Sequence, residues 1–198
     1  MLPVFRSYLD GALPLRRVAD QGCGKLRNLA ALTGFARKLY LVDTQAQINS
    51  TTVRWGRHVP LTALARDFGA NHDTTIRLLD DASFARSRLE LDAVLSVAVY
   101  DVVPRAVRAQ IIRDAHRNLR RDGYLLLVVP RNDASITQRC RPTNRYADGH
   151  VFANRRALTF YRNFARRDAL LRVLTKAGFA LEADLSTYRY LTLVLRAR

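Results

Sequence analysis

Short apolar runs alternate with amphipathic stretches along most of the chain. The apolar runs hold three to nine residues with at most one charged residue each, as in parallel strands that are buried on both faces. The amphipathic stretches between them are long enough for helices, so the order predicts an α/β fold. The predicted strands are 17–19, 39–42, 75–79, 91–99 and 124–129.

Two long helices are predicted in the second half of the chain. In 104–121, apolar residues recur every three or four positions, arginines occupy the other arc, and a proline starts the stretch. A second helix is predicted at 159–177, where Gly178 ends it, and strands at 179–183 and 188–195 follow. The segment 1–15 has the spacing of a short leading helix.

Composition fits one compact domain that spans residues 1–198. With 198 residues, 48% hydrophobic and 25% charged, the chain is long enough to bury a sizeable core. A second domain is not needed.

The first two predicted strands end in residues typical of a nucleotide site. The first runs into Asp20, followed by Gly22 and Gly24, and the second delivers Asp43. Glycines let the backbone turn tightly, so that a ligand lies against bare N–H groups. An acid about 20 residues further on accepts hydrogen bonds from ribose hydroxyls. The third glycine of G-x-G-x-x-G would fall at Arg27, which disfavours NAD and FAD.

The run Asp20-Gln21-Gly22-Cys23-Gly24 resembles motif I of the class I S-adenosylmethionine-dependent methyltransferases, D-x-G-x-G-x-G. The family's third glycine falls at Leu26, which makes the loop bulkier. The resemblance covers about residues 16–198 and implies a Rossmann-like, doubly wound, mostly parallel seven-stranded sheet with helices on both faces. It also implies S-adenosyl-L-methionine as the cofactor.

Later segments line up with the same family. Asp81 and Ala82 resemble the pair that meets the adenine, 92–97 resembles motif IV beneath the methionine part, and 119–127 resembles the helix, glycine turn and fifth strand that follow. The cofactor-binding residues that the resemblance implies are Asp20, Gly22, Cys23, Gly24, Asp43, Thr44, Asp81, Ala82, Ser96 and Val97.

Methyl transfer from a sulfonium is a direct displacement that needs alignment and exclusion of water more than acid–base groups. A catalytic residue is therefore not evident. The candidates are Tyr100 and Asp101, just beyond the fourth strand, and Tyr146 and His150. The sequence after Ser96 lacks the Pro-Pro-aromatic box of the base amino-methylases.

The segment 131–158 has no clear periodicity, and stretches of that length are often functional lids. Six arginines and two aspartates give it a local charge of +4. Arg139, Arg141, Arg145, Tyr146, Asp148 and His150 are candidate acceptor contacts, and a plain surface loop is the alternative. Basic neighbours of Cys140 are expected to lower its thiol pKa, although a free, unreactive thiol is the favoured interpretation.

The net charge of +16 comes from 33 basic and 17 acidic residues and is typical of a polyanion binder. Trp55, beside Arg54 and Arg57, could stack on a base or pack in the core. The preferred acceptor is a nucleic acid or another anionic molecule. The alternatives are a small-molecule methyltransferase and a non-catalytic binding protein on the same fold.

No apolar run reaches the ~20 residues of a membrane span, and the N-terminus lacks a basic region before an apolar stretch. We therefore expect a cytoplasmic protein without a membrane partner. The two cysteines and four histidines show no ligand spacing, so neither a disulfide framework nor a metal site is predicted. Oligomeric state is left open.

Overall fold

The structure is a computed structural model, and its chain separates into two compact units. The first unit is Met1–Leu95 with Arg117–Gly123, and the second is Ser96–His116 with Tyr124–Arg198. The single domain expected from composition stays a prediction. The structure describes residues 5, 15–54, 56–131, 138, 140–154, 157–162, 164 and 166–198. The leading helix expected at 1–15, Trp55 and Arg139 therefore lie outside the described residues, apart from positions 5 and 15.

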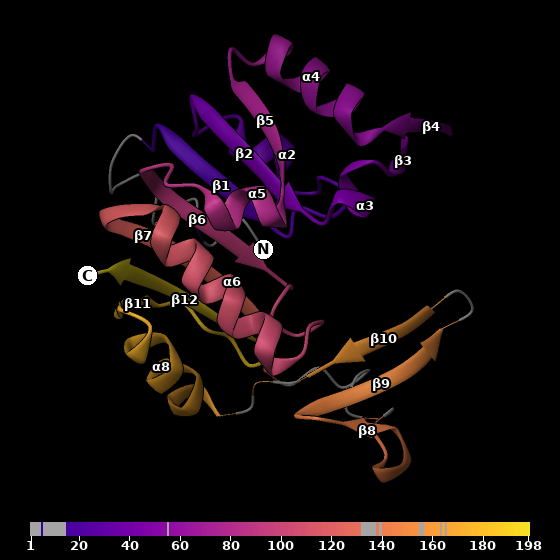
Figure 1. Cartoon of the computed structure of the whole chain (residues 1–198), viewed down its shortest axis with the longest axis vertical. Helices are drawn as coiled ribbons and strands as arrows, with labels where there is room; N and C mark the ends of the chain where they lie inside the picture. The colour runs from indigo at the N-terminus through magenta and orange to yellow at the C-terminus, as the bar shows by residue number, and fades with distance from the viewer. Residues whose placement is uncertain are drawn as a thin grey trace. The chain divides into compact units, whose positions relative to one another are not determined.

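A seven-stranded, mostly parallel sheet has the strand order β11-β12-β7-β6-β1-β2-β5 (Figure 1). This confirms the α/β fold class and the number of strands predicted from the sequence. The strands are β1 (Arg17–Gln21), β2 (Lys38–Asp43), β5 (Thr75–Asp80), β6 (Leu91–Val97), β7 (Leu119–Pro130), β11 (Phe179–Asp184) and β12 (Tyr190–Ala197).

In the first unit, β1 pairs in parallel with β2 and β6, and β2 pairs in parallel with β5. The register sets Asp20 opposite Leu41 and Asp43 opposite Asp80. The acids at the strand ends therefore share the carboxyl edge, where open α/β sheets bind ligands. The unit also contains α2 (Leu29–Leu32), α3 (Gln45–Ile48), α4 (Leu61–Asn71), α5 (Asp81–Arg86) and the hairpin of β3 (Thr51–Arg54) and β4 (Arg57–Pro60).

In the second unit, β12 pairs antiparallel with β7 and β11. The apolar side chains of β7 are buried, and Leu125 and Leu127 have no exposed surface. The unit also contains most of α6 (Arg105–Asn118), together with α8 (Arg167–Lys176), a 3-10 turn (Pro142–Asn144) and the three-stranded sheet of β8 (Arg145–Tyr146), β9 (Gly149–Asn154) and β10 (Ala157–Tyr161). We call β8, β9 and β10 the small sheet.

The boundary between α6 and β7 differs from the prediction. The helix ends at Asn118, and the strand already begins at Leu119, so no glycine turn separates them. Asp122 takes the left-handed backbone (φ 63°), which aspartate tolerates better than most residues. A Cβ on Gly123 would lie 2.9 Å from the Leu91 carbonyl oxygen, so this glycine permits close backbone packing.

The predicted helix at 159–177 and the irregular segment 131–158 were both wrong in part. The helix α8 begins only at Arg167, because the preceding Thr159, Phe160 and Tyr161 pair with β9 as strand β10. Threonine and aromatic residues favour strands when a partner is present. The described part of 131–158 is accordingly built mainly of the 3-10 turn and the small sheet. Among the described residues, no helix is both long and apolar enough to cross a membrane.

Candidate functional site

The loop after β1 has two glycines in the left-handed region, Gly22 (φ 81°) and Gly24 (φ 53°). A side chain at either position would be strained, so these two positions favour glycine. The N–H groups of Gly22 and Cys23 donate to the Val42 carbonyl at 2.8 and 3.1 Å. These bonds hold the loop against the end of β2.

Leu26 stands where the related motif has its third glycine, and its backbone is also left-handed (φ 59°). Its side chain is 1% exposed and belongs to the core. A non-glycine residue in this conformation costs roughly 1–2 kcal/mol. The loop therefore keeps the backbone shape that glycine favours, and burial of the leucine offsets the strain.

Asp43 ties the loop to the next helix. Its Oδ2 accepts the Gly24 N–H at 2.8 Å, and its Oδ1 accepts the Thr44 N–H at 2.8 Å. Thr44 caps α3 by accepting the Gln47 N–H, and the Gln47 amide donates to the Gly24 carbonyl at 2.9 Å. Each carboxylate oxygen has further acceptor capacity, so Asp43 can also receive two hydroxyl groups.

Asp20 is buried at the end of β1, and the Asn28 amide donates to both of its oxygens at 3.2 Å. Burial raises the Asp20 pKa to about 7, with a smaller contribution from Asp43, and only the Asn28 bond opposes it. Burial also raises the pKa of the Cys23 thiol, as do Asp20 and Asp43. Cys23 therefore stays protonated and fills space in the loop.

The third strand end has two acids with different roles. Asp80 caps α5 by accepting the Ser83 N–H at 2.6 Å and the Ser83 hydroxyl at 3.0 Å, and these bonds lower its pKa. Asp81 is exposed and accepts the Ala82 N–H at 2.9 Å. An adenine ring nitrogen at Ala82, as the sequence resemblance implies, would have to replace that bond.

In the second unit, Ser96 lies near the end of β6 with no exposed surface, and its hydroxyl has no hydrogen-bond partner among the described residues. The next strand residue, Val97, is half-buried. Tyr100 is 1% exposed, and its hydroxyl also lacks a partner within the described chain. Burial raises the Tyr100 pKa, so the phenol keeps its proton.

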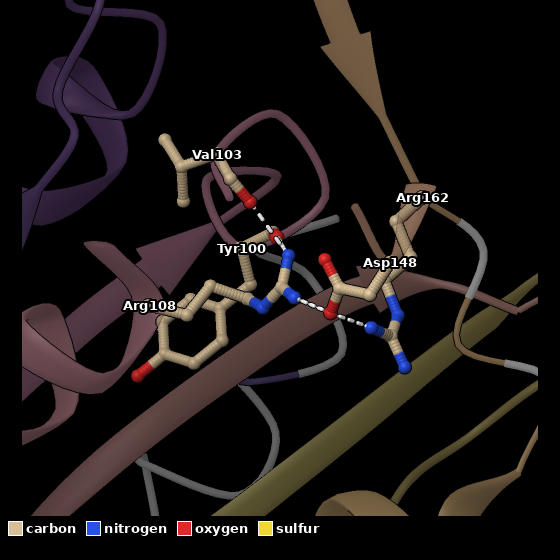
Figure 2. A network of polar contacts seen from close by, with 5 residues as sticks. All are labelled: Tyr100, Val103, Arg108, Asp148 and Arg162. Carbon is tan, nitrogen blue, oxygen red and sulfur yellow. Dashed lines mark hydrogen bonds and ion pairs between the residues drawn. The ribbon is translucent and has the colours of Figure 1, made fainter. Parts of the chain in front are cut away.

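Figure 2 shows a cluster of charges beside Tyr100. Arg108 of α6 and Arg162, just after β10, both donate to Oδ2 of Asp148, in the turn between β8 and β9. Arg108 also donates to the Val103 carbonyl at 2.5 Å and to the Tyr100 carbonyl at 3.3 Å. We call Arg108, Asp148 and Arg162 the arginine clamp; it joins the small sheet to α6 and the segment after β6.

An open pocket of about 850 Å³ lies beside the small sheet in the second unit. Its described lining residues include two arginines and no acid. Candidate acceptor contacts Arg141, Arg145 and Tyr146 are among them. Other walls come from Pro104, Val151 and Phe160.

Other candidates from the sequence do not line this pocket. His150 pairs with Arg145 and Tyr161 in the small sheet, and its ring is stacked 6.5 Å from that of Phe152. Asp101 is buried, and its carbonyl accepts the Arg162 N–H at 2.8 Å. Burial raises the Cys140 pKa, which corrects the expectation that basic neighbours lower it. The described residues contain no cluster of three metal-binding side chains.

Sequence reasoning missed several residues that organise these sites. Gln47 and Asn28 fix the loop and its buried acid, and Arg108 holds Asp148 from 40 positions away. Thr44 follows a strand and is a typical helix N-cap residue, so the sequence did signal that α3 begins there. That helix brings Gln47 to the loop. The other two contacts have no short-range signature.

No protein-family model and no curated protein matches the sequence. Solved structures do match. The 1,6-didemethyltoxoflavin-N1-methyltransferase of Burkholderia thailandensis, with 1,6-didemethyltoxoflavin and S-adenosylhomocysteine bound, has 19% identity and a TM-score of 0.66, over 98% of this chain and 75% of that one. A SAM-dependent methyltransferase of Methanosarcina mazei has 15% identity and a TM-score of 0.70, over 100% and 98% of the chains.

Magnesium protoporphyrin IX methyltransferase of Synechocystis, with S-adenosylhomocysteine bound, has 17% identity and a TM-score of 0.64, over 99% of this chain and 80% of that one. These likenesses extend over nearly the whole chain. The chain therefore has the fold of the S-adenosylmethionine-dependent methyltransferases.

Proposed function

We propose that this protein is an S-adenosylmethionine-dependent methyltransferase that acts on an anionic acceptor. The observation that carries the proposal is the loop Gly22–Gly24, which is fastened to Asp43 at the end of the next strand. The proposed cofactor contacts are Asp20, Gly22, Cys23, Gly24, Asp43, Thr44, Asp81, Ala82, Ser96 and Val97.

The residues at this loop fit a nucleoside ligand. The two glycines leave backbone free of side chains, and even a Cβ on Gly24 would have no neighbour closer than the Gly22 carbonyl oxygen at 4.0 Å. The Asp43 carboxylate has acceptor capacity left for the two ribose hydroxyls. A loop without the third glycine of the dinucleotide fingerprint favours a ligand that has no pyrophosphate.

When bound, the cofactor supplies an electrophilic methyl group on a sulfonium. The chain must then align an acceptor atom with that methyl and exclude water. Tyr100 is unsuited to act as a general base, because its buried phenol keeps its proton. A role in shaping the site or donating a hydrogen bond agrees better with its burial.

Charge supports an anionic acceptor. The chain carries +16, and the pocket beside the small sheet includes Arg141 and Arg145 but no acid among its described lining residues. The names of the toxoflavin and magnesium protoporphyrin enzymes specify small acceptors. Among anionic acceptors we therefore favour a small molecule, and nucleic acid is the second candidate because of the large net charge.

The test is transfer of labelled methyl groups from S-adenosylmethionine into a cell lysate that is then separated into RNA, DNA, protein and metabolites. We expect label in the metabolite fraction. Gly22→Val should abolish transfer, because a branched side chain would obstruct the backbone at a left-handed position. Gly34→Ala is the matched control, since a Cβ there makes only an ordinary contact at 3.6 Å.

Label in RNA or DNA would favour the second candidate. No transfer by a folded wild-type protein into any fraction, or full transfer by a folded Gly22→Val variant, would contradict the proposed activity or its site. Circular dichroism of both variants establishes that they are folded.

A further inference from the structure

The pocket beside the small sheet has a wall of apolar and aromatic side chains. Strand pairing sets Tyr146 opposite Gly149 and Val151 opposite Phe160, and directly opposed residues point to the same face. Gly149 and Val151 are two residues apart on β9, so they also point to the same face. Tyr146, Val151 and Phe160 therefore share one face, and all three line the pocket. Its volume of about 850 Å³ lies within the range of small-molecule sites.

Gly149 makes this wall possible. A Cβ at this position would lie 2.3 Å from Cζ of Phe160 and 2.6 Å from the Tyr161 carbonyl oxygen. The Phe160 ring therefore lies directly on the backbone of β9, where any side chain at position 149 would displace it. Phe160 is 8% exposed, whereas Tyr146 is 59% exposed and offers its ring for contact.

The charged side chains among the described lining residues are of one sign. Arg141 and Arg145 are both exposed, and neither forms an ion pair with another described residue. A guanidinium binds a carboxylate or phosphate through parallel hydrogen bonds and also stacks on an aromatic face. Tyr146 and Phe160 suit a flat aromatic ring, because aromatic rings pack favourably against one another, and the two arginines suit a negative group on that ring.

The arginine clamp holds the pocket in shape. Asp148 joins the β8–β9 turn to Arg108 and Arg162, and Arg108 fixes the carbonyl of Val103, the neighbour of the lining residue Pro104. The clamp thus connects the small sheet with the segment that forms another wall. Binding to a preformed pocket costs less ordering than binding to a loose loop.

We propose that this pocket binds the methyl acceptor, and that the acceptor is a small, flat aromatic molecule with a negatively charged group. The role of this molecule as methyl acceptor rests on the proposed function, whereas its binding to the pocket does not. Arg141 and Arg145 hold the anionic group, and Tyr146 and Phe160 contact the ring.

The test compares two probes of equal shape, 2-naphthoate and the neutral 2-naphthamide, by titration calorimetry. We expect 2-naphthoate to bind at least tenfold more tightly, because hydrogen bonds to charged groups contribute that much or more. Arg145→Gln or Arg141→Gln should reduce this preference by about tenfold or more. Tyr146→Ala should weaken both probes to a similar extent.

Arg66→Gln is the matched control, because it removes the same charge at an exposed position on α4 of the first unit. Equal affinity for the two probes, or equal losses in the Arg66 and Arg145 variants, would overturn the inference. Tight binding of a single-stranded oligonucleotide that depends on Arg141 and Arg145, without binding of 2-naphthoate, would assign these arginines to nucleic acid and would also overturn it.

Calorimetry with S-adenosylhomocysteine on the same protein separates this inference from the proposed function. Cofactor binding without preference for 2-naphthoate contradicts the pocket assignment alone. Preference for 2-naphthoate without cofactor binding contradicts the proposed function alone. The unmethylated acceptor of any small labelled product should be retained on an anion exchanger at neutral pH; a neutral or cationic acceptor would contradict the acceptor class.

Discussion

Asp148→Asn should destabilise the protein through the arginine clamp. The Arg108 side chain is 7% exposed, so loss of its carboxylate partner leaves a nearly buried charge uncompensated. Breaking a buried pair in this way costs about 3–5 kcal/mol. Arg108 keeps its bonds to two carbonyl groups, and Asp148 is 24% exposed. We therefore expect a loss near the lower end of this range, about 3 kcal/mol.

Urea denaturation followed by circular dichroism measures this effect. With a slope of about 2–3 kcal/mol per molar urea, the midpoint should fall by about 1 M or slightly more. Arg162→Gln should cost less, about 1 kcal/mol, because Arg162 is 32% exposed and Arg108 still neutralises Asp148. The double variant should be little worse than Asp148→Asn alone. A loss below about 0.5 kcal/mol for Asp148→Asn, or strictly additive losses, would refute the clamp.

Three further predictions concern single groups. Raising the pH from 4 to 7 should destabilise the wild type relative to Asp20→Asn, by up to about 1.4 kcal/mol per pH unit. The reason is that the Asp20 carboxyl keeps its proton in the folded chain (pKa about 7), whereas in the unfolded chain it has lost that proton. Parallel profiles of stability against pH for the two proteins in urea titrations would contradict this. Leu26→Gly should be more stable than Leu26→Ala by about 0.5–1 kcal/mol in urea titrations, since only glycine relieves the left-handed strain, and the reverse order would contradict it. At pH 7.5, iodoacetamide should alkylate Cys140 no faster than free cysteine, because burial raises its pKa; rapid modification detected by mass spectrometry would contradict it.

The strands of the first unit were predictable because their sequence carries its own signal. β1, β2 and β6 are buried on both faces, so they appear as apolar runs, and Asp20 and Asp43 lie at or next to the ends of the first two. The glycine loop was recognisable for the same reason. Positive φ angles at Gly22 and Gly24 are a local backbone requirement that the sequence must satisfy locally.

The small sheet was missed because its signals are not local. Phe160 and Phe164 are four residues apart, a spacing that resembles a helical face, but Phe160 lies in β10 because β9 supplies a partner and Gly149 makes room for its ring. The pairing of Arg108 with Asp148 likewise joins positions 40 residues apart. Periodicity and short motifs hold no information about such contacts, so the arginine clamp could only be found in the structure.

Binding of S-adenosylhomocysteine is the most direct test of the proposed cofactor site. Titration calorimetry should find that the wild type binds it, and that Asp43→Ala weakens binding by roughly ten- to a hundredfold through loss of charged hydrogen bonds. The 2′-deoxy analogue should bind the wild type more weakly than S-adenosylhomocysteine, whereas a folded Asp43→Ala variant should barely distinguish the two ligands. No binding by the wild type, or an undiminished preference for the 2′-hydroxyl in the variant, would contradict the account.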